Sequence, residues 1–302
     1  MALIWHLRVF VGLGAIFAAL SELWFYPIAD LQGLPVLVVF YAIAAHAAFL
    51  SVARLGGGGA LGAYLAAVLL GFAIEGIPVF ELYSALPFTL IWTSMAWHGV
   101  VSGLIGLWLY RYFWARGVPS FVVMNLCLGA FLGLWGAYFW GSDQDGPRFF
   151  DQVPFAFALF AGGHLILANA QLPKPTGDLI MWGMVGIVVV GFGAGALWVM
   201  FPMSLVLPLA CAITVIAVLG ARSAQSMWAR VPWRRSWVML LMPGAAAAVF
   251  AASSGAVWVT ELNAYVILIF GPVSVGLLLW CLGRALSARL STSGQPPGRG
   301  GA

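Results

Sequence analysis

A series of long apolar runs constrains this chain most, because each run has the length that is needed to cross a bilayer. A transmembrane helix needs about 20 mostly apolar residues, and ten such runs alternate here with short turns rich in Gly, Pro or charge. Only 7% of the residues are charged, whereas a soluble domain carries about a quarter. The sequence therefore predicts an all-α, polytopic helical bundle of the membrane.

The predicted spans end where Gly, Pro or charged residues interrupt the apolar pattern. The division between the seventh and eighth spans rests on Phe201 and Pro202, where one kinked element also fits. We predict a single membrane domain over 1–284 and a disordered cytoplasmic tail over 285–302, which is rich in Pro and Gly. The ten predicted spans are 9–26, 34–53, 60–77, 86–110, 119–140, 153–171, 179–200, 202–221, 237–258 and 264–283.

The charged residues predict the orientation, because Lys and Arg collect in short cytoplasmic loops. With ten spans and a cytoplasmic N-terminus, the one basic residue outside is Arg148 and the one acid inside is Asp178. We therefore predict a multi-pass protein of the cell inner membrane with both termini in the cytoplasm. Its net charge of +4 then follows from topology and calls for no nucleic-acid partner. The basic residues predicted inside are Arg8, Arg54, Arg111, Arg116, Lys174, Arg222, Arg230, Arg234, Arg235, Arg284, Arg289 and Arg299. The acids predicted on or near the outer side are Glu22, Asp30, Glu75, Glu81, Asp143, Asp145, Asp151 and Glu261.

Short segments in the two halves of the chain resemble each other. "VFVGLGA" from Val9 resembles "VVVGFGA" from Val188, and "VFELYSA" from Val79 resembles "VTELNAY" from Val259. The partners lie about 180 residues apart, which favours a parallel repeat of the first four spans in the last four.

Three histidines, His46, His98 and His164, lie within predicted spans, where ionisable side chains are costly and indicate function. Each is eleven or twelve residues past the start of a span that runs inward. At 1.5 Å per residue this places all three about 17 to 18 Å from the outer surface. If the three spans are neighbours, the imidazoles form a ring at one depth.

The span that contains His98 carries a polar stripe. Ser94, His98 and Ser102 recur every four residues, beside the pair Gly99 and Gly103. Small residues spaced by four let helices approach closely in a membrane. We therefore expect His98 to face protein and not lipid.

Neutral imidazole is a common ligand of transition metals and of haem iron. The sequence thus favours a haem or metal site with His46, His98 and His164 as cofactor ligands and Ser94 and Ser102 in support. Alternatively, each histidine forms a hydrogen bond with a group on a neighbouring helix.

A second group consists of carboxylates near the outer side. Glu22 and Glu75 lie in the outer third of their spans, too deep to be solvated cheaply, and Glu81 follows with Tyr83 close by. Together they predict an acidic vestibule that attracts cations. As an acid and a base, these three carboxylates are also the candidate catalytic residues.

Three classes of protein remain open at this point. The first binds haem or a transition metal, the second is a proton-coupled secondary transporter of a small molecule, and the third is an enzyme that acts on an isoprenoid or other lipid. Whether the protein is an enzyme is left open, as is a complex with another membrane protein. The partners that we expect are the bilayer and a small-molecule, metal or lipid ligand, and the three cysteines indicate no disulfide framework.

Overall fold

The apolar runs form helices, because a helix satisfies its own backbone hydrogen bonds and needs none from the surrounding hydrocarbon. The computed structural model describes residues 2–24, 33–140, 146–168 and 179–293. Within these ranges, ten helices are long and apolar enough to cross a membrane, and there is no β-strand. The prediction of an all-α chain with ten membrane-spanning helices is confirmed at this level.

The helices follow one another with short connections. In chain order they are α1 (Ala2–Ala18), η1 (Ala19–Leu23), α2 (Leu34–Arg54), α3 (Gly59–Gly76), η3 (Glu81–Tyr83), η4 (Leu90–Leu109), α4 (Tyr110–Arg116), α5 (Val118–Trp140), α6 (Gly146–Ile166), α7 (Leu179–Gly191), η5 (Phe192–Ala196), α8 (Leu197–Val199), η6 (Met203–Leu205), α9 (Val206–Val218), η7 (Leu219–Ala221), η8 (Trp233–Leu240), α10 (Leu241–Ser253), η9 (Val257–Glu261) and α11 (Leu262–Ser293). The elements η1, η4 and η5 are π-helical, η4 over 20 residues, and the other η elements are 3₁₀-helices.

Several helix ends differ from the prediction. The first helix begins at Ala2, because the residues before the predicted start are themselves mostly apolar. Helix α6 spans Gly146–Ile166, so it begins and ends earlier than 153–171. Helix α11 continues to Ser293, since Ala, Leu and Arg favour helix and no Gly or Pro intervenes. Of the predicted tail, therefore, 285–293 is helical, and 294–302 lies outside the described residues.

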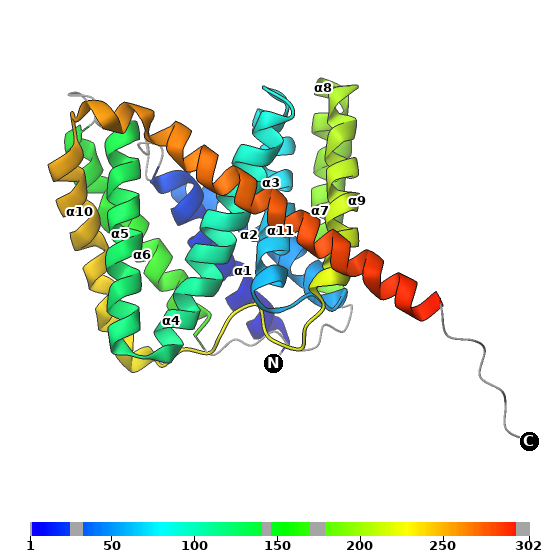
Figure 1. Ribbon diagram of the computed structural model, residues 1–302, viewed down its shortest axis with the longest axis horizontal. Coiled ribbons are helices and arrows are strands. Elements are labelled where there is room, and N and C mark those ends of the chain that lie inside the picture. The colour runs from blue at the N-terminus through cyan, green and yellow to red at the C-terminus, as the bar shows by residue number, and fades with distance from the viewer. Residues whose placement is uncertain (1, 25–32, 141–145, 169–178, 294–302) are drawn as a thin grey trace, which may run out of the picture.

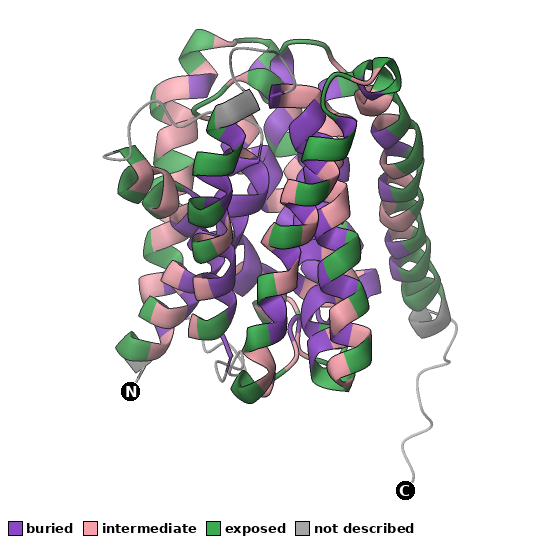
Figure 2. Ribbon diagram, turned by 90° about the vertical axis from the view of Figure 1, so that its left-hand side faces the viewer, coloured by how far each residue is buried: buried purple, intermediate pink, exposed green. Residues whose placement is uncertain are grey.

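The first four helical spans form the buried centre of the molecule (Figure 1). Helix α3 packs extensively against η4 and α2, and α1 lies between α2 and α6. Helix α11 crosses η4 obliquely in Figure 1 and is largely exposed along its length in Figure 2. The centre is therefore shielded from the surroundings, whereas α7 and α11 present most of their side chains outward.

Arginine side chains connect segments of the bundle that are far apart in the sequence. Four of them donate hydrogen bonds to main-chain carbonyls of such segments. The membrane orientation and the parallel repeat stay predictions. The four contacts join Arg8 to Ile166, Arg111 to Ala229, Arg222 to Leu55 and Arg235 to Trp114.

Candidate acid–base site

A pocket of about 370 Å³ brings together the three carboxylates that the sequence singled out and one of the three histidines. It is formed where η1, the C-terminal end of α3, η3, η4, α5 and the start of α11 meet. These ends lie away from the end of the bundle that carries the N-terminus (Figure 1). The lining residues are Ser21, Glu22, Glu75, Val79, Glu81, Trp92, Thr93, Trp97, His98, Trp135, Phe139 and Asn263.

A row of hydrogen-bonded side chains lies at the wall of this pocket and consists of a carboxyl group, an imidazole and hydroxyl groups. His98 Nε2 lies 3.0 Å from Glu75 Oε1, and His98 Nδ1 lies 3.1 Å from Ser21 Oγ. Ser21 Oγ is in turn 3.2 Å from Ser102 Oγ. When Glu75 is a carboxylate, the N–H group at Nε2 of His98 donates a hydrogen bond to it. The other ring nitrogen, Nδ1, then accepts a hydrogen bond from the hydroxyl group of Ser21. The row is therefore arranged for proton transfer.

Close packing of α3 against η4 sets the distance between Glu75 and His98. A Cβ atom at Gly71 would lie 2.8 Å from Ser94 Cα and 2.9 Å from His98 Cβ, so only glycine permits this approach. Glu75 follows Gly71 by about one helical turn on the same face of α3. The close contact at Gly71 thus brings the carboxyl group of Glu75, one helical turn further along α3, within hydrogen-bond distance of the imidazole of His98.

The predicted glycine pair on η4 packs as expected. A Cβ atom at Gly99 would lie 2.6 Å from a methyl group of Val68, and one at Gly103 would lie 2.2 Å from Ala67 Cβ. Both neighbours belong to α3. The prediction that small residues on this helix face a protein partner is confirmed, and His98 itself is buried.

The other two carboxyl groups are also held by hydroxyl donors. Tyr41, which is fully buried, donates to Glu22 Oε1 over 2.8 Å. Ser84 donates to Glu81 Oε1 over 2.9 Å. Glu81 is exposed, so it marks where the pocket reaches the surface, while Glu22 and Glu75 lie deeper. None of the described residues that line the pocket is Lys or Arg, and the site is therefore acidic.

Tryptophans form one wall of the pocket. Trp97 and Trp135 stack with their ring centroids 4.6 Å apart, and Trp92 lies 6.0 Å from each of them. The indole nitrogen of Trp97 donates to the carbonyl of Leu20, which connects this wall to the segment before Ser21. One side of the pocket thus presents flat apolar surface and the other presents carboxylates.

Tyr83 supports the site without lining the pocket. Its hydroxyl donates to the carbonyl of Gly76 over 2.8 Å and so fixes η3 against the end of α3. Burial, with a smaller contribution from Cys211, raises the pKa of Tyr83 to about 12, which keeps this donor protonated. The position of Glu81 therefore depends on Tyr83.

The structure places the three histidines of the predicted ring in three different hydrogen-bonded groups. His46 Nε2 lies 3.0 Å from Nδ1 of His6. His164 Nε2 donates to the carbonyl of Gly106 over 3.2 Å, and Nη1 of Arg111 donates to the carbonyl of His164 over 2.9 Å. Only His98 lines the acidic pocket.

The predicted common depth of the three histidines depended on the start of the sixth span, which the structure places earlier in the chain. With α6 at Gly146–Ile166, His164 lies two residues from the C-terminal end of its helix, whereas His46 lies in the middle of α2. Among the described residues, no three His, Cys, Asp or Glu side chains are grouped so that they would hold a metal ion. The structure thus gives His46, His98 and His164 different hydrogen-bond partners, and a haem or metal site on them stays a prediction.

Several residues of the site, and two buried polar residues outside it, were not found from the sequence. Ser21, Tyr41 and the tryptophans carry no motif, and only their contacts reveal them. His6 precedes the predicted start of the first span, and Arg111 was assigned to a loop although it is completely buried. A polar residue beside Glu22 in a membrane span was the one available signal for Ser21.

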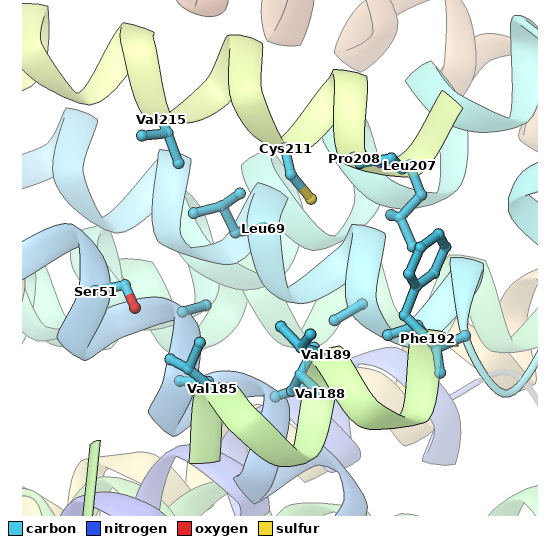
Figure 3. A pocket seen from close by; sticks show the side chains of 15 residues that line it. Ser51, Leu69, Val185, Val188, Val189, Phe192, Leu207, Pro208, Cys211 and Val215 are labelled. Carbon is cyan, nitrogen blue, oxygen red and sulfur yellow. The ribbon is translucent and has the colours of Figure 1, made fainter. Parts of the chain in front are cut away.

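A second, larger pocket has a different character. It has a volume of about 430 Å³ and lies between α2, α3, α7 and α9. Figure 3 shows that its labelled side chains are aliphatic or aromatic apart from Ser51 and Cys211. None of its described lining residues is a carboxylate or a histidine, so it is suited to hydrocarbon and not to proton transfer.

Fold and site together define a helical, membrane-type protein with buried histidines, one of which pairs with a carboxylate in an acidic, tryptophan-walled pocket. Comparisons with protein-family models, with curated proteins and with solved structures find no match for this chain.

Proposed function

We propose that this protein is a membrane-embedded enzyme that uses Glu75 and His98 for acid–base chemistry on an amphiphilic lipid. The observation that carries the proposal is the 3.0 Å contact between Glu75 Oε1 and His98 Nε2 in a pocket with two further carboxyl groups. Proton transfer requires an acid and a base within hydrogen-bond reach of each other and of the substrate. Glu75 retains 14% exposure of its side chain, whereas His98 retains 2%. Glu75 is therefore the member of the pair that a substrate meets first.

The lining of the pocket favours a particular class of lipid. The described lining has three carboxyl groups and no Lys or Arg, so it repels an anionic head group and attracts a cationic one. The faces of tryptophan rings also attract cations. We therefore propose a substrate with a neutral or positively charged head, whose apolar part lies along the wall of Trp92, Trp97 and Trp135.

The other carboxyl groups take separate roles in this proposal. Glu22, which accepts a hydrogen bond from Tyr41, is the second acid or base inside the pocket. Glu81 lies at the exposed rim and attracts the head group. Two carboxyl groups in different surroundings are a common basis for dividing acid and base roles.

The proposal is tested with purified protein in mild detergent. The protein is incubated with a lipid extract of the producing cells in a mixture of D₂O and H₂¹⁸O, and the lipids are analysed by mass spectrometry. We expect a neutral or cationic lipid to be converted to a product that carries deuterium or ¹⁸O in a bond that does not exchange with water. Substitution Glu75→Gln should slow this conversion at least about 100-fold, the usual contribution of a general acid or base.

The matched control is Glu261→Gln, which changes an exposed carboxylate outside the pocket. It should react at the wild-type rate. If no lipid changes mass, or if Glu75→Gln and Glu261→Gln react equally fast, the proposal is wrong. Substrate-driven proton movement across proteoliposomes without any chemical change in the substrate would instead favour the transporter hypothesis.

The haem or transition-metal hypothesis has its own measurement. A Soret band or a stoichiometric metal in gently purified protein, weakened in His98→Ala, would favour a cofactor-binding protein over an enzyme of acid–base type. His98 is the histidine to change, because it alone of the three lines the pocket.

A further inference from the structure

We infer that Ser21 is a covalent nucleophile and that the substrate is consequently a lipid with an acyl ester bond. The inference rests on the proposed acid–base function, to which it adds the attacking atom and the bond that breaks. It is carried by the row from Glu75 through His98 to Ser21, in which each link is a hydrogen bond of 3.0 or 3.1 Å.

An activated serine requires a base at its hydroxyl and a third group that orients the base. His98 Nδ1 is within reach of the hydroxyl of Ser21, and Glu75 Oε1 accepts from the opposite ring nitrogen. This carboxylate fixes the tautomer in which Nδ1 is free to take a proton, and it stabilises the imidazolium that forms. The three side chains come from η1, η4 and α3, so the arrangement is created by the packing and not by a local motif.

Other hydroxyl groups near the pocket lack this arrangement. The hydroxyl of Thr93 donates to the carbonyl of Thr89. Ser102 Oγ shares a hydrogen bond with Ser21 Oγ and does not line the pocket. Ser21 is therefore the one pocket-lining hydroxyl, among the residues that the structure describes, that shares a hydrogen bond with the imidazole.

The backbone around Ser21 also departs from regular helix. Residues Ala19–Leu23 form a π-helical turn directly after α1. Such turns occur often at functional sites, because the additional residue in the turn redirects neighbouring side chains. Here the consecutive residues Ser21 and Glu22 both line the pocket.

The reaction that follows is acyl transfer to water. The hydroxyl proton of Ser21 moves to His98 Nδ1 while Ser21 Oγ bonds to the ester carbonyl carbon, and the carbonyl electron pair moves to its oxygen. When this pair returns, the ester C–O bond breaks, and His98 gives its proton to the leaving alkoxide. Water then attacks the acyl-serine in the same way, with His98 as the base, and releases a carboxylic acid and free Ser21. Throughout, Ser102 holds Ser21 Oγ by their 3.2 Å contact.

The inference is tested without knowledge of the lipid by an uncharged alkyl fluorophosphonate. Attack by a serine oxygen forms a P–O bond and releases fluoride, and the modified residue is identified by peptide mass spectrometry. We expect the probe to modify Ser21 in the wild-type protein. Ser21→Ala should lose the modification, and His98→Gln, which leaves Ser21 in place, should slow it at least about 100-fold.

The matched control is Ser51→Ala, since Ser51 lines the apolar pocket of Figure 3 and lies outside the acidic one. Its rate of modification at Ser21 should equal that of the wild type. The melting temperature of each variant in detergent shows whether it is folded, so that a slow reaction is not mistaken for unfolding.

The two proposals fail in different ways. If Ser21 stays unmodified, or if His98→Gln reacts as fast as the wild type, the covalent role is wrong. Lipid turnover that depends on Glu75 would then still support the acid–base function, with Ser21 orienting His98. Conversely, rapid modification of Ser21 without turnover of any lipid would support the nucleophile and contradict the proposed substrate.

Discussion

The helical span from Leu90 to Arg116 carries two groups of hydrogen-bonded polar side chains, and the two groups differ in their partners and surroundings. At His98, an imidazole meets a carboxyl group and a hydroxyl group at the wall of a pocket. At Arg111, near the other end of the span, a guanidinium group meets main-chain carbonyls and His164, and neither side chain is exposed. His98 and Arg111 are both buried, and the first of them lines a pocket of about 370 Å³.

The partners explain what each group does. Arg111 donates to the carbonyls of Ala229, His164 and Leu167 over 2.9 to 3.0 Å, and two of these acceptors belong to the end of α6 or directly follow it. A cation is stabilised by the negative end of a helix dipole. Arg111 therefore stabilises the packing of helix ends through these hydrogen bonds, and we call this contact the Arg111 clamp. Burial and a titratable side chain occur in both groups, and access to a pocket is what distinguishes a candidate site from a structural contact.

The largest expected contrast comes from replacing the two histidines in turn. His98→Gln should lower lipid turnover by about 10²- to 10⁴-fold, because a glutamine cannot exchange a proton with Glu75. His164→Gln should leave turnover within about threefold of the wild type and cost about 1 to 3 kcal/mol of unfolding free energy through poorer hydrogen bonds in a buried place. Turnover and thermal melting are measured on the same preparations. Equal loss of turnover in both variants would contradict the contrast.

Removing the clamp should act on stability and not on chemistry. Arg111→Met leaves several buried carbonyls without a donor, and we expect a loss of about 3 kcal/mol of unfolding free energy. The control is Arg116→Met, since Arg116 is exposed and lies 5.1 Å above the ring of Tyr112, a contact that contributes about 0.5 to 1 kcal/mol. Both losses are read from unfolding in detergent. Modification of Ser21 in the folded fraction should be unchanged, and a clamp variant as stable as its control would show that Arg111 is dispensable.

The sequence predicted the helices well because hydrophobicity alone determines them. Apolar runs interrupted by Gly, Pro and charge located ten spans, and the pair Gly99 and Gly103 located a packing face. Intramembrane carboxylates are rare enough to stand out, so Glu22 and Glu75 were found, and they do line one pocket together with the nearby Glu81. These features are local, and each can be identified without knowledge of neighbouring helices.

Which helices are neighbours could not be predicted, and this affected the histidines most. A common depth for His46, His98 and His164 required the correct start of α6, and it also required three helices to surround one point. The structure instead pairs His46 with His6 and His164 with Gly106. Long-range contacts between apolar helices leave little trace in one sequence, because many side chains of similar size fill the same space.

The smallest expected effect concerns the close packing at Gly71, which sets the distance between Glu75 and His98. Gly71→Ala places a Cβ atom 2.8 Å from the backbone of Ser94 and 2.9 Å from His98 Cβ, so α3 and η4 must separate. Overpacking of this kind costs about 1 to 3 kcal/mol. Displacement by a few tenths of an ångström also lengthens the contact between carboxyl group and imidazole, and we expect turnover and Ser21 modification to fall about tenfold.

The matched control for this contact is Gly186→Ala in α7, where an added Cβ atom meets nothing within 4 Å. Alanine favours helix over glycine by about 1 kcal/mol, so this control should melt at the same temperature as the wild type or slightly above it, with full activity. If Gly71→Ala retains the wild-type rate, the distance between Glu75 and His98 does not limit the chemistry. If it loses stability but keeps its rate of Ser21 modification, the two helices have shifted together, and the row from Glu75 to Ser21 moves as one unit.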